Sequence, residues 1–187
     1  LDPAERSARE AAGRPAALRL DAHGARRRVQ DLFHGEVEAV VDDFVVRRND
    51  GVAAYNLAVV VDDADQGIEQ VVRGDDLLLG TPRQALLCDL LELPVPAYAH
   101  VPLVLGPSGE RLAKRDGAVT LADRRALGES AGAVCGLLAA SLGLSEPGEA
   151  VHPRELIARF DPAALPRSPW LFDHPAPVHR NGGLTPD

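Results

Sequence analysis

Residues 80–94, GTPRQALLCDLLELP, constrain the fold more than any other part of the chain. Thr81 is a favourable N-cap, Pro82 suits the first helical position, and Gln84 completes a Thr-x-x-Gln capping box. A helix is therefore predicted from Thr81 to the proline at position 94, which cannot continue it. Its apolar stripe consists of Leu86, Leu87, Leu90 and Leu91.

Strand-like segments lie on both sides of this helix. GIEQVVRG precedes it at residues 67–74, and AHVPLVLG follows it at residues 99–106. A strand, a short link, a helix and a second buried strand form a βαβ unit, most simply half of a doubly wound sheet. The predicted fold class is therefore α/β.

The segment before this unit is predicted to be mainly extended. Residues 2–12 have helical composition, residues 15–21 alternate like a strand, and residues 23–63 are predicted to form successive strands. RNDG, at residues 48–51, is predicted to be the turn of a hairpin. The β-branched run of valines at positions 59–61 is typical of a strand buried on both faces.

The segment after the unit is predicted to be helical and then irregular. An apolar helix is expected over residues 131–142, ended by Gly143, and a shorter one is expected near Pro153. From Asp161 onward the chain is rich in proline and polar residues, which predicts a flexible C-terminus over residues 161–187.

Charge and apolar patterning exclude some functions. The net charge of −8 gives no general attraction to polyanions, so a protein that coats DNA is excluded. No apolar run is long enough to cross a membrane, so a cytoplasmic protein is expected. Cys88 and Cys135 lie in apolar helical patterns without nearby metal-ligand spacing, which favours buried thiols, and no metal site is predicted within the chain.

Ligands of doubly wound sheets bind beyond the carboxyl ends of the strands. Acidic and basic side chains follow the three predicted strand ends, which suits a polar, charged substrate. These residues are Asp62, Asp63, Arg73, Asp75, Asp76, Arg111, Lys114 and Arg115. Each also has a simpler interpretation: RLAKR as a solvated loop, Asp62 and Asp63 as strand-end caps, and Tyr55 as a core residue.

Residues 42–118 carry four motifs in one order: D-F-V-x-R-R-x-D-G, Y-x-L-A-x-V-V-D-D, V-x-R-G-x-D-L-L and T-P-R-Q. In this order they closely resemble the second half of the catalytic domain of class I glutamyl-tRNA synthetases. The resemblance implies the second half of a Rossmann-like catalytic domain, followed by a small helical region.

The resemblance also implies roles for particular residues. RLAKR, at residues 111–115, takes the place of the K-M-S-K-S signature, which implies that Lys114 is catalytic and binds the ATP phosphates. Arg111 keeps the charge of the first lysine, whereas Ala113 lacks the hydroxyl of the serine. Tyr55 and Arg73 match positions that bind glutamate in the family.

Few residues follow this loop. In this respect the chain resembles the short branch of the family, whose members activate glutamate with ATP and attach it to the queuosine base of tRNA(Asp). The alternatives are a truncated synthetase that charges tRNA(Glu) and a non-catalytic fragment that binds tRNA or a partner. The H-I-G-H-type signature and the zinc site of this branch would lie upstream, so the chain is expected to be a C-terminal portion that is inactive alone. ATP with magnesium, glutamate and queuosine-bearing tRNA(Asp) are the expected ligands of the whole enzyme, which is expected to be monomeric and not bound to membranes.

The resemblance divides the chain into four predicted segments. Residues 1–40 are the expected tail of an inserted acceptor-binding domain, and residues 41–105 are the second half of the Rossmann-like domain. Residues 106–160 are expected to hold the signature loop and the helical region, ahead of the C-terminal segment 161–187.

Overall fold

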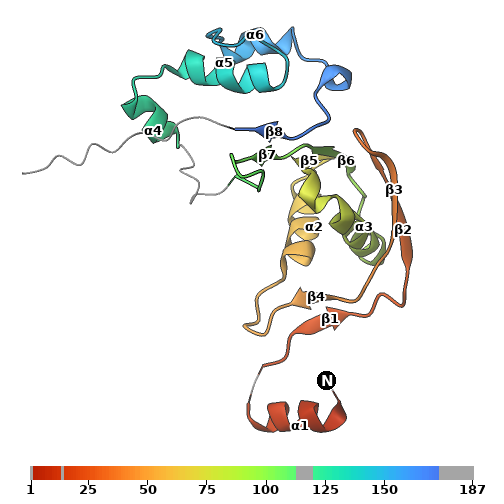
Figure 1. Cartoon of the computed structure of the whole chain (residues 1–187). Helices are drawn as coiled ribbons and strands as arrows, with labels where there is room; N and C mark the ends of the chain where they lie inside the picture. Colours follow the sequence, from red (N-terminus) through yellow and green to blue (C-terminus); the bar gives the residue numbers. More distant parts are fainter. Residues whose placement is uncertain (1, 14, 113–119, 173–187) are drawn as a thin grey trace, which may run out of the picture. The chain divides into compact units, whose positions relative to one another are not determined.

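A computed structural model describes residues 2–13, 15–112 and 120–172. The chain divides into two compact units, Leu1–Val101 and Pro102–Asp187. The first unit contains, in order, α1 (Pro3–Ala11), β1 (Leu18–Leu20), β2 (Arg26–Asp31), β3 (Gly35–Val40), β4 (Phe44–Arg47), α2 (Tyr55–Asp65), β5 (Gln70–Gly74), the 3-10 helix η1 (Asp75–Gly80), α3 (Thr81–Leu90) and β6 (Ala97–Val101) (Figure 1). The predicted N-terminal helix and the strand ending near Asp21 are confirmed by α1 and β1.

The main sheet of the first unit has the strand order β3-β2-β6-β5. β5 and β6 are parallel and are connected through α3, which confirms the predicted βαβ unit. β2 also runs parallel to β6 and forms an antiparallel hairpin with β3. The sheet therefore includes residues 26–40, which precede the predicted domain limit at residue 41. β1 and β4 form a separate antiparallel pair.

α3 packs against β2 and against α2, which lies beside it (Figure 1). The helix ends at Leu90, earlier than the predicted stop at Pro94. Leu86 and Leu87 are buried as the stripe requires, whereas Leu90 and Leu91 are exposed because they lie at the helix end. The predicted apolar stripe is therefore confirmed for Leu86 and Leu87 only.

The prediction of a strand over the valines at positions 59–61 was wrong, because this segment belongs to α2. The predicted turn at residues 48–51 is present, and Gly51 adopts a positive φ of 85° in it, but the turn leads into a helix and not into a second hairpin strand. Apolar residues at positions 57, 60, 61 and 64 have helical spacing. Packing of this face against the core outweighs the β-propensity of valine, which is only a weak, context-dependent preference.

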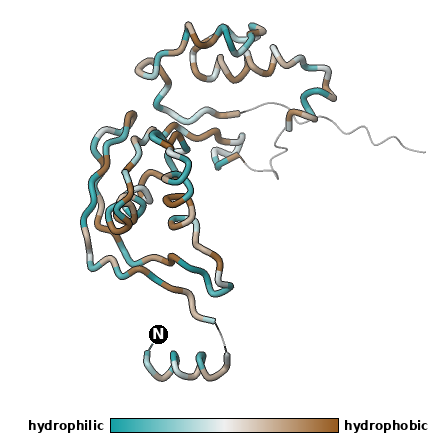
Figure 2. The backbone as a smooth tube through the Cα atoms, turned by 180° about the vertical axis from the view of Figure 1, so that it is seen from behind, coloured by the Kyte–Doolittle hydropathy of each residue, from teal (hydrophilic) through white to brown (hydrophobic). Residues whose placement is uncertain are grey.

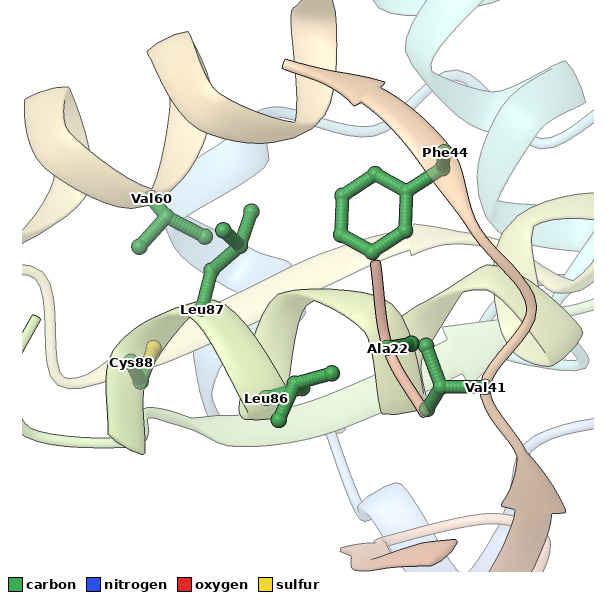
Figure 3. Packing of buried hydrophobic residues seen from close by; sticks show 7 residues of the cluster. All are labelled: Ala22, Val41, Phe44, Val60, Leu86, Leu87 and Cys88. Carbon is green, nitrogen blue, oxygen red and sulfur yellow. The ribbon is translucent and has the colours of Figure 1, made fainter. Parts of the chain in front are cut away.

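The larger core cluster joins α2, α3, β4 and the segments beside β1 and β3 (Figure 3). Its buried members are Ala22, Val41, Phe44, Val60, Leu86, Leu87 and Cys88. Leu57 and Val59 of α2 pack against this cluster. The buried-thiol prediction is confirmed for Cys88, while Cys135 in the second unit is half-buried.

The second unit contains β7 (Val104–Leu105), α4 (Leu121–Ala126), α5 (Ala131–Ser141), α6 (Pro153–Ile157), the 3-10 helix η3 (Pro162–Ala164) and β8 (Trp170–Leu171). Both predicted helices are confirmed as α5 and α6, and α5 is predominantly hydrophobic (Figure 2). A side chain at Gly136 would collide with the backbone carbonyl of Glu149, so α5 and the chain before α6 approach as closely as glycine allows.

The segment expected to be flexible begins with ordered elements. η3 and β8 lie within residues 161–172, and β8 pairs in parallel with β7. Residues 173–187 lie outside the described residues, and the predicted domain limits stay predictions. Among the helices of the described ranges, none is both long and apolar enough to cross a membrane.

Candidate functional site

Three parallel strands of the first unit end at the same edge of the sheet, and each carries a polar side chain at or next to its last residue. Asp31 is the last residue of β2, while Arg73 and His100 lie one residue before the ends of β5 and β6. The strand register pairs Arg73 with His100, and Asp31 with Tyr98. The fold thus brings together three residues that are far apart in the sequence, at the edge where α/β sheets bind ligands.

Arg73 is half-buried and is held by three hydrogen bonds. Its Nε–H donates to Nε2 of His100 at 2.9 Å. Its Nη1 and Nη2 groups donate to Oε1 of Gln84 and to Oγ1 of Thr81, both at 2.8 Å. The guanidinium also lies over the ring of Tyr98, 5.5 Å from its centroid. These contacts fix the plane of the guanidinium on several sides.

His100 and Asp31 form a fully buried pair behind Arg73. Nδ1 of His100 lies 2.6 Å from Oδ2 of Asp31, and both side chains have 0% exposure. The backbone N–H of His100 donates to the same oxygen at 3.0 Å. The backbone N–H groups of Phe33 and His34 donate to Oδ1 at 2.9 and 3.0 Å. Asp31 therefore accepts four hydrogen bonds and ties the end of β2 to β6.

Two pKa values at this edge differ from their usual range. Burial acts to raise the pKa of Asp31, but the hydrogen bonds from the His100 ring and from the three backbone N–H groups outweigh burial and lower it. Burial is the main cause that raises the pKa of Tyr98 to about 12. Asp31 is therefore held as the carboxylate and Tyr98 as the neutral phenol.

The predicted capping box of α3 was wrong, because its two side chains serve Arg73. The N-cap of α3 is Gly80, and no side chain caps the helix. The hydroxyl of Thr81 accepts from Arg73 and also lies 3.2 Å from Nε2 of His100. The amide oxygen of Gln84 accepts from Arg73, and its Nε2 donates to Oδ1 of Asn56 at 3.2 Å. The first turn of α3 is thus part of the candidate site.

Tyr55, the first residue of α2, is 57% exposed, so the alternative that placed it in the core was wrong. Its neighbour Asn56 contacts Gln84, which in turn contacts Arg73. The start of α2 is therefore connected to the carboxyl edge of the sheet through Asn56, and Tyr55, the residue before it, is exposed.

Only part of the predicted rim of charged residues lies at this edge. Asp75 and Asp76 follow β5 directly, in η1. Asp62 and Asp63 were misplaced, since they lie near the end of α2, where the carbonyl of Asp63 accepts from the backbone of Ile68 before β5 begins. Arg111 is exposed in the second unit and forms an isolated antiparallel bridge with Leu105. Ala113, Lys114 and Arg115 lie outside the described residues.

Sequence reasoning did not include Asp31, His100, Asn56 or the roles of Thr81 and Gln84 in the site. The available signal was weak: His100 is the one histidine of the strand AYAHV, whose other residues are alanine, tyrosine and valine. Within the ranges that the structure describes, no group of three or more His, Cys, Asp and Glu side chains could hold a metal ion.

Known proteins resemble this chain over most of its length. The chain is 61% identical over 172 residues to the "Glutamyl-Q tRNA(Asp) synthetase" of Nocardia farcinica. The matched region covers 92% of this chain and 54% of that protein. It is 52% identical to the protein of the same name from Symbiobacterium thermophilum, covering 90% of this chain and 53% of that protein. The chain thus spans about half the length of these relatives.

Among solved structures, the glutamate-tRNA synthetase of Elizabethkingia anophelis matches with a TM-score of 0.69 and 26% identity, covering 92% of this chain and 40% of that chain. The fold is therefore that of a class I synthetase catalytic domain. Residues 1–176 match the family described as "tRNA synthetases class I (E and Q), catalytic domain", and the chain belongs to this family.

Proposed function

We propose that this chain contributes the glutamate-binding edge and the ATP-phosphate loop of an enzyme that activates glutamate and attaches it to the queuosine base of tRNA(Asp). The observation that carries this proposal is the environment of Arg73. A half-buried guanidinium lies at the ligand edge of the sheet, and its three acceptors are a ring nitrogen, an amide oxygen and a hydroxyl.

An arginine has five N–H donors, and three of those on Arg73 are engaged. The other two belong to the terminal nitrogens, and within the described ranges no carboxylate forms an ion pair with them. Two N–H donors on one guanidinium match the two oxygens of a carboxylate. We assign them to the side-chain carboxylate of glutamate, with the accessible Tyr55 as a second contact.

This assignment explains selection of glutamate over glutamine. The amide of glutamine would turn a donor towards an N–H of Arg73 and leave buried polar groups unpaired. A site built for one set of hydrogen bonds rejects an analogue that cannot make them.

The reaction requires a cation that follows moving negative charge. An α-carboxylate oxygen of glutamate bonds to the α-phosphorus of ATP, and pyrophosphate leaves with the electrons of the broken P–O bond. Queuosine then takes the glutamyl group from the adenylate, and AMP leaves. We assign Lys114 to the ATP phosphates, because a compact ammonium on a flexible stem suits charge that passes to pyrophosphate.

Magnesium is expected to accompany ATP. Phosphate oxygens are ligands that Mg²⁺ commonly takes in nucleotide sites. The residues of this chain would orient glutamate and stabilise the leaving group.

The choice of tRNA(Asp) over tRNA(Glu) is supported by the names of the two relatives at 61% and 52% identity. A decisive test is a chimera in which this chain replaces the matching region of the Nocardia farcinica protein. We expect the chimera to exchange pyrophosphate into ATP with glutamate in the absence of tRNA, and then to label tRNA(Asp) that bears queuosine.

Unmodified tRNA(Asp) and tRNA(Glu) are the controls and should not be labelled. Dependence of the exchange on tRNA(Glu) would overturn the proposed substrate and favour an ordinary glutamyl-tRNA synthetase. The 187-residue chain alone is expected to give no exchange above that of its Lys114→Ala variant, and a clear excess would contradict this expectation.

A further inference from the structure

The positions of donors and acceptors define the protonation of His100. Oδ2 of Asp31 accepts the backbone N–H of His100 and lies 2.6 Å from its Nδ1, so Nδ1 carries the proton. Nε2 then has a free lone pair, and the Nε–H of Arg73 points at it from 2.9 Å. His100 is therefore the neutral Nδ1–H tautomer, which donates on one side and accepts on the other.

The other protonation states conflict with the same contacts. A proton on Nε2 would place an N–H of His100 against an N–H of Arg73. A doubly protonated ring would add repulsion between two cations. Asp31 favours the Nδ1–H tautomer because both of its oxygens are already acceptors, with Oδ1 occupied by the N–H groups of Phe33 and His34.

The bond to His100 controls the orientation of Arg73. Nε is the guanidinium nitrogen nearest to the side-chain stem, so the acceptor that it meets fixes rotation of the whole plane. Thr81 accepts from Nη2 on the same side, 3.2 Å from Nε2 of His100. The two remaining N–H donors are thereby held in a set direction, away from these acceptors.

We propose that His100 is a positioning residue for the glutamate site: held as the Nδ1–H tautomer by Asp31, it accepts from Nε–H of Arg73 and aims the outer N–H groups of that guanidinium at the side-chain carboxylate. This inference rests on the proposed function, because it assigns glutamate to Arg73. It adds His100 and Asp31, which touch no ligand, to the residues that determine glutamate affinity.

Two substitutions separate the bonds on the two sides of the ring. His100→Asn keeps a donor near the position of Nδ1 and loses the acceptor for Arg73. His100→Gln carries its amide near the position of Nε2 and keeps that acceptor. If His100 were only a satisfied core residue, both variants would be impaired in proportion to their loss of stability.

The test measures the KM for glutamate and for ATP in the chimera carrying each variant, together with its thermal stability. We expect His100→Asn to raise the KM for glutamate about tenfold to a hundredfold, as expected for loss of a hydrogen bond to a charged group. The KM for ATP should stay within about twofold, since Arg73 does not contact the nucleotide in this scheme. His100→Gln should recover most of the affinity for glutamate.

An equal rise in the KM for glutamate in both variants, or a rise that follows their melting temperatures, would overturn the positioning role. A chimera with wild-type residues that does not activate glutamate would instead overturn the proposed function, and this inference with it.

The tautomer is tested without activity, by nitrogen-15 NMR of the 187-residue chain labelled at histidine. His100, assigned by its loss in His100→Asn, should show a protonated Nδ1 and an unprotonated Nε2. Asp31→Asn replaces one carboxylate oxygen with an NH2 donor, so this variant should change the protonation pattern of His100. A proton on Nε2 in the wild-type chain would overturn the inference even if the chimera uses glutamate.

Discussion

Arginines in two regions of the first unit have opposite surroundings. On the β2–β3 hairpin, Arg26 and Arg28 are exposed and pair with Glu38, at 3.0 and 2.8 Å. The hydrogen bond with Glu38 is the main cause that raises the pKa of Arg28, and the bond with Arg28 is the main cause that lowers the pKa of Glu38. At the carboxyl edge of the sheet, Arg73 is half-buried and contacts uncharged acceptors.

The difference shows how position determines what an arginine can do. On the hairpin, carboxylates already satisfy the guanidinium groups, and water screens the charges, so these pairs contribute little to stability. At the edge, Arg73 bonds to the ring of His100, and the ring contacts the carboxylate of Asp31 on its other side. The ring of His100 therefore separates the guanidinium of Arg73 from this negative charge. Arg73 is thus held in place by uncharged acceptors, and we propose that its remaining donors bind glutamate.

The largest expected effect distinguishes the buried carboxylate of Asp31 from the exposed carboxylate of Glu38. Asp31→Ala should lower the free energy of unfolding by about 3–5 kcal/mol, because two buried and two partly buried donors lose their acceptor. Glu38→Ala on the hairpin should leave stability within experimental error. Urea denaturation of the 187-residue chain measures both, and similar losses would remove the distinction between the regions.

The next effect concerns the two arginines. Arg73→Lys should raise the KM for glutamate in the chimera by about a hundredfold, because lysine lacks the planar fork. Arg28→Lys keeps its charge beside Glu38 and should leave every kinetic constant unchanged. If Arg73→Lys, like Arg28→Lys, left the KM for glutamate unchanged, Arg73 would act only through its positive charge.

Alkaline pH should weaken the edge through Tyr98. Its pKa is raised to about 12 in the folded chain, above the unfolded value, so the native state holds the phenolic proton more tightly. The resulting stability is present below pH of about 10 and is lost as pH rises through about 12, amounting to roughly 3 kcal/mol. Unfolding of wild type and Tyr98→Phe across this range tests it, since the variant should lose this part of the pH dependence.

The smallest expected effect is at Thr81. Thr81→Val removes the hydroxyl that accepts from Arg73 and should cost about 1 kcal/mol of stability. Thr81→Ser keeps the hydroxyl and should cost less than half as much. A larger loss in the serine variant would indicate that the methyl group, and not the hydrogen bond, is what this buried position requires.

Local patterns were sufficient for much of the fold. The strand containing Arg73, the helix at 81–90 and the strand containing His100 were predictable, because each has its own apolar period and boundary residues. The pattern failed at α2, where the valines suggested a strand and the helical spacing of the same face was the better guide. It failed again at Thr81, whose capping role is replaced by a bond to Arg73.

By itself, the sequence determined the βαβ unit, the family motifs and the candidacy of Tyr55 and Arg73 for glutamate. Lys114, predicted for ATP, lies outside the described residues. Only the tertiary structure decided which groups hold Arg73. His100 and Asp31 lie 27 and 42 positions from it, and no local pattern pairs residues at such distances. Parallel strand pairing brings their ends to one edge, and burial there requires every donor to find an acceptor.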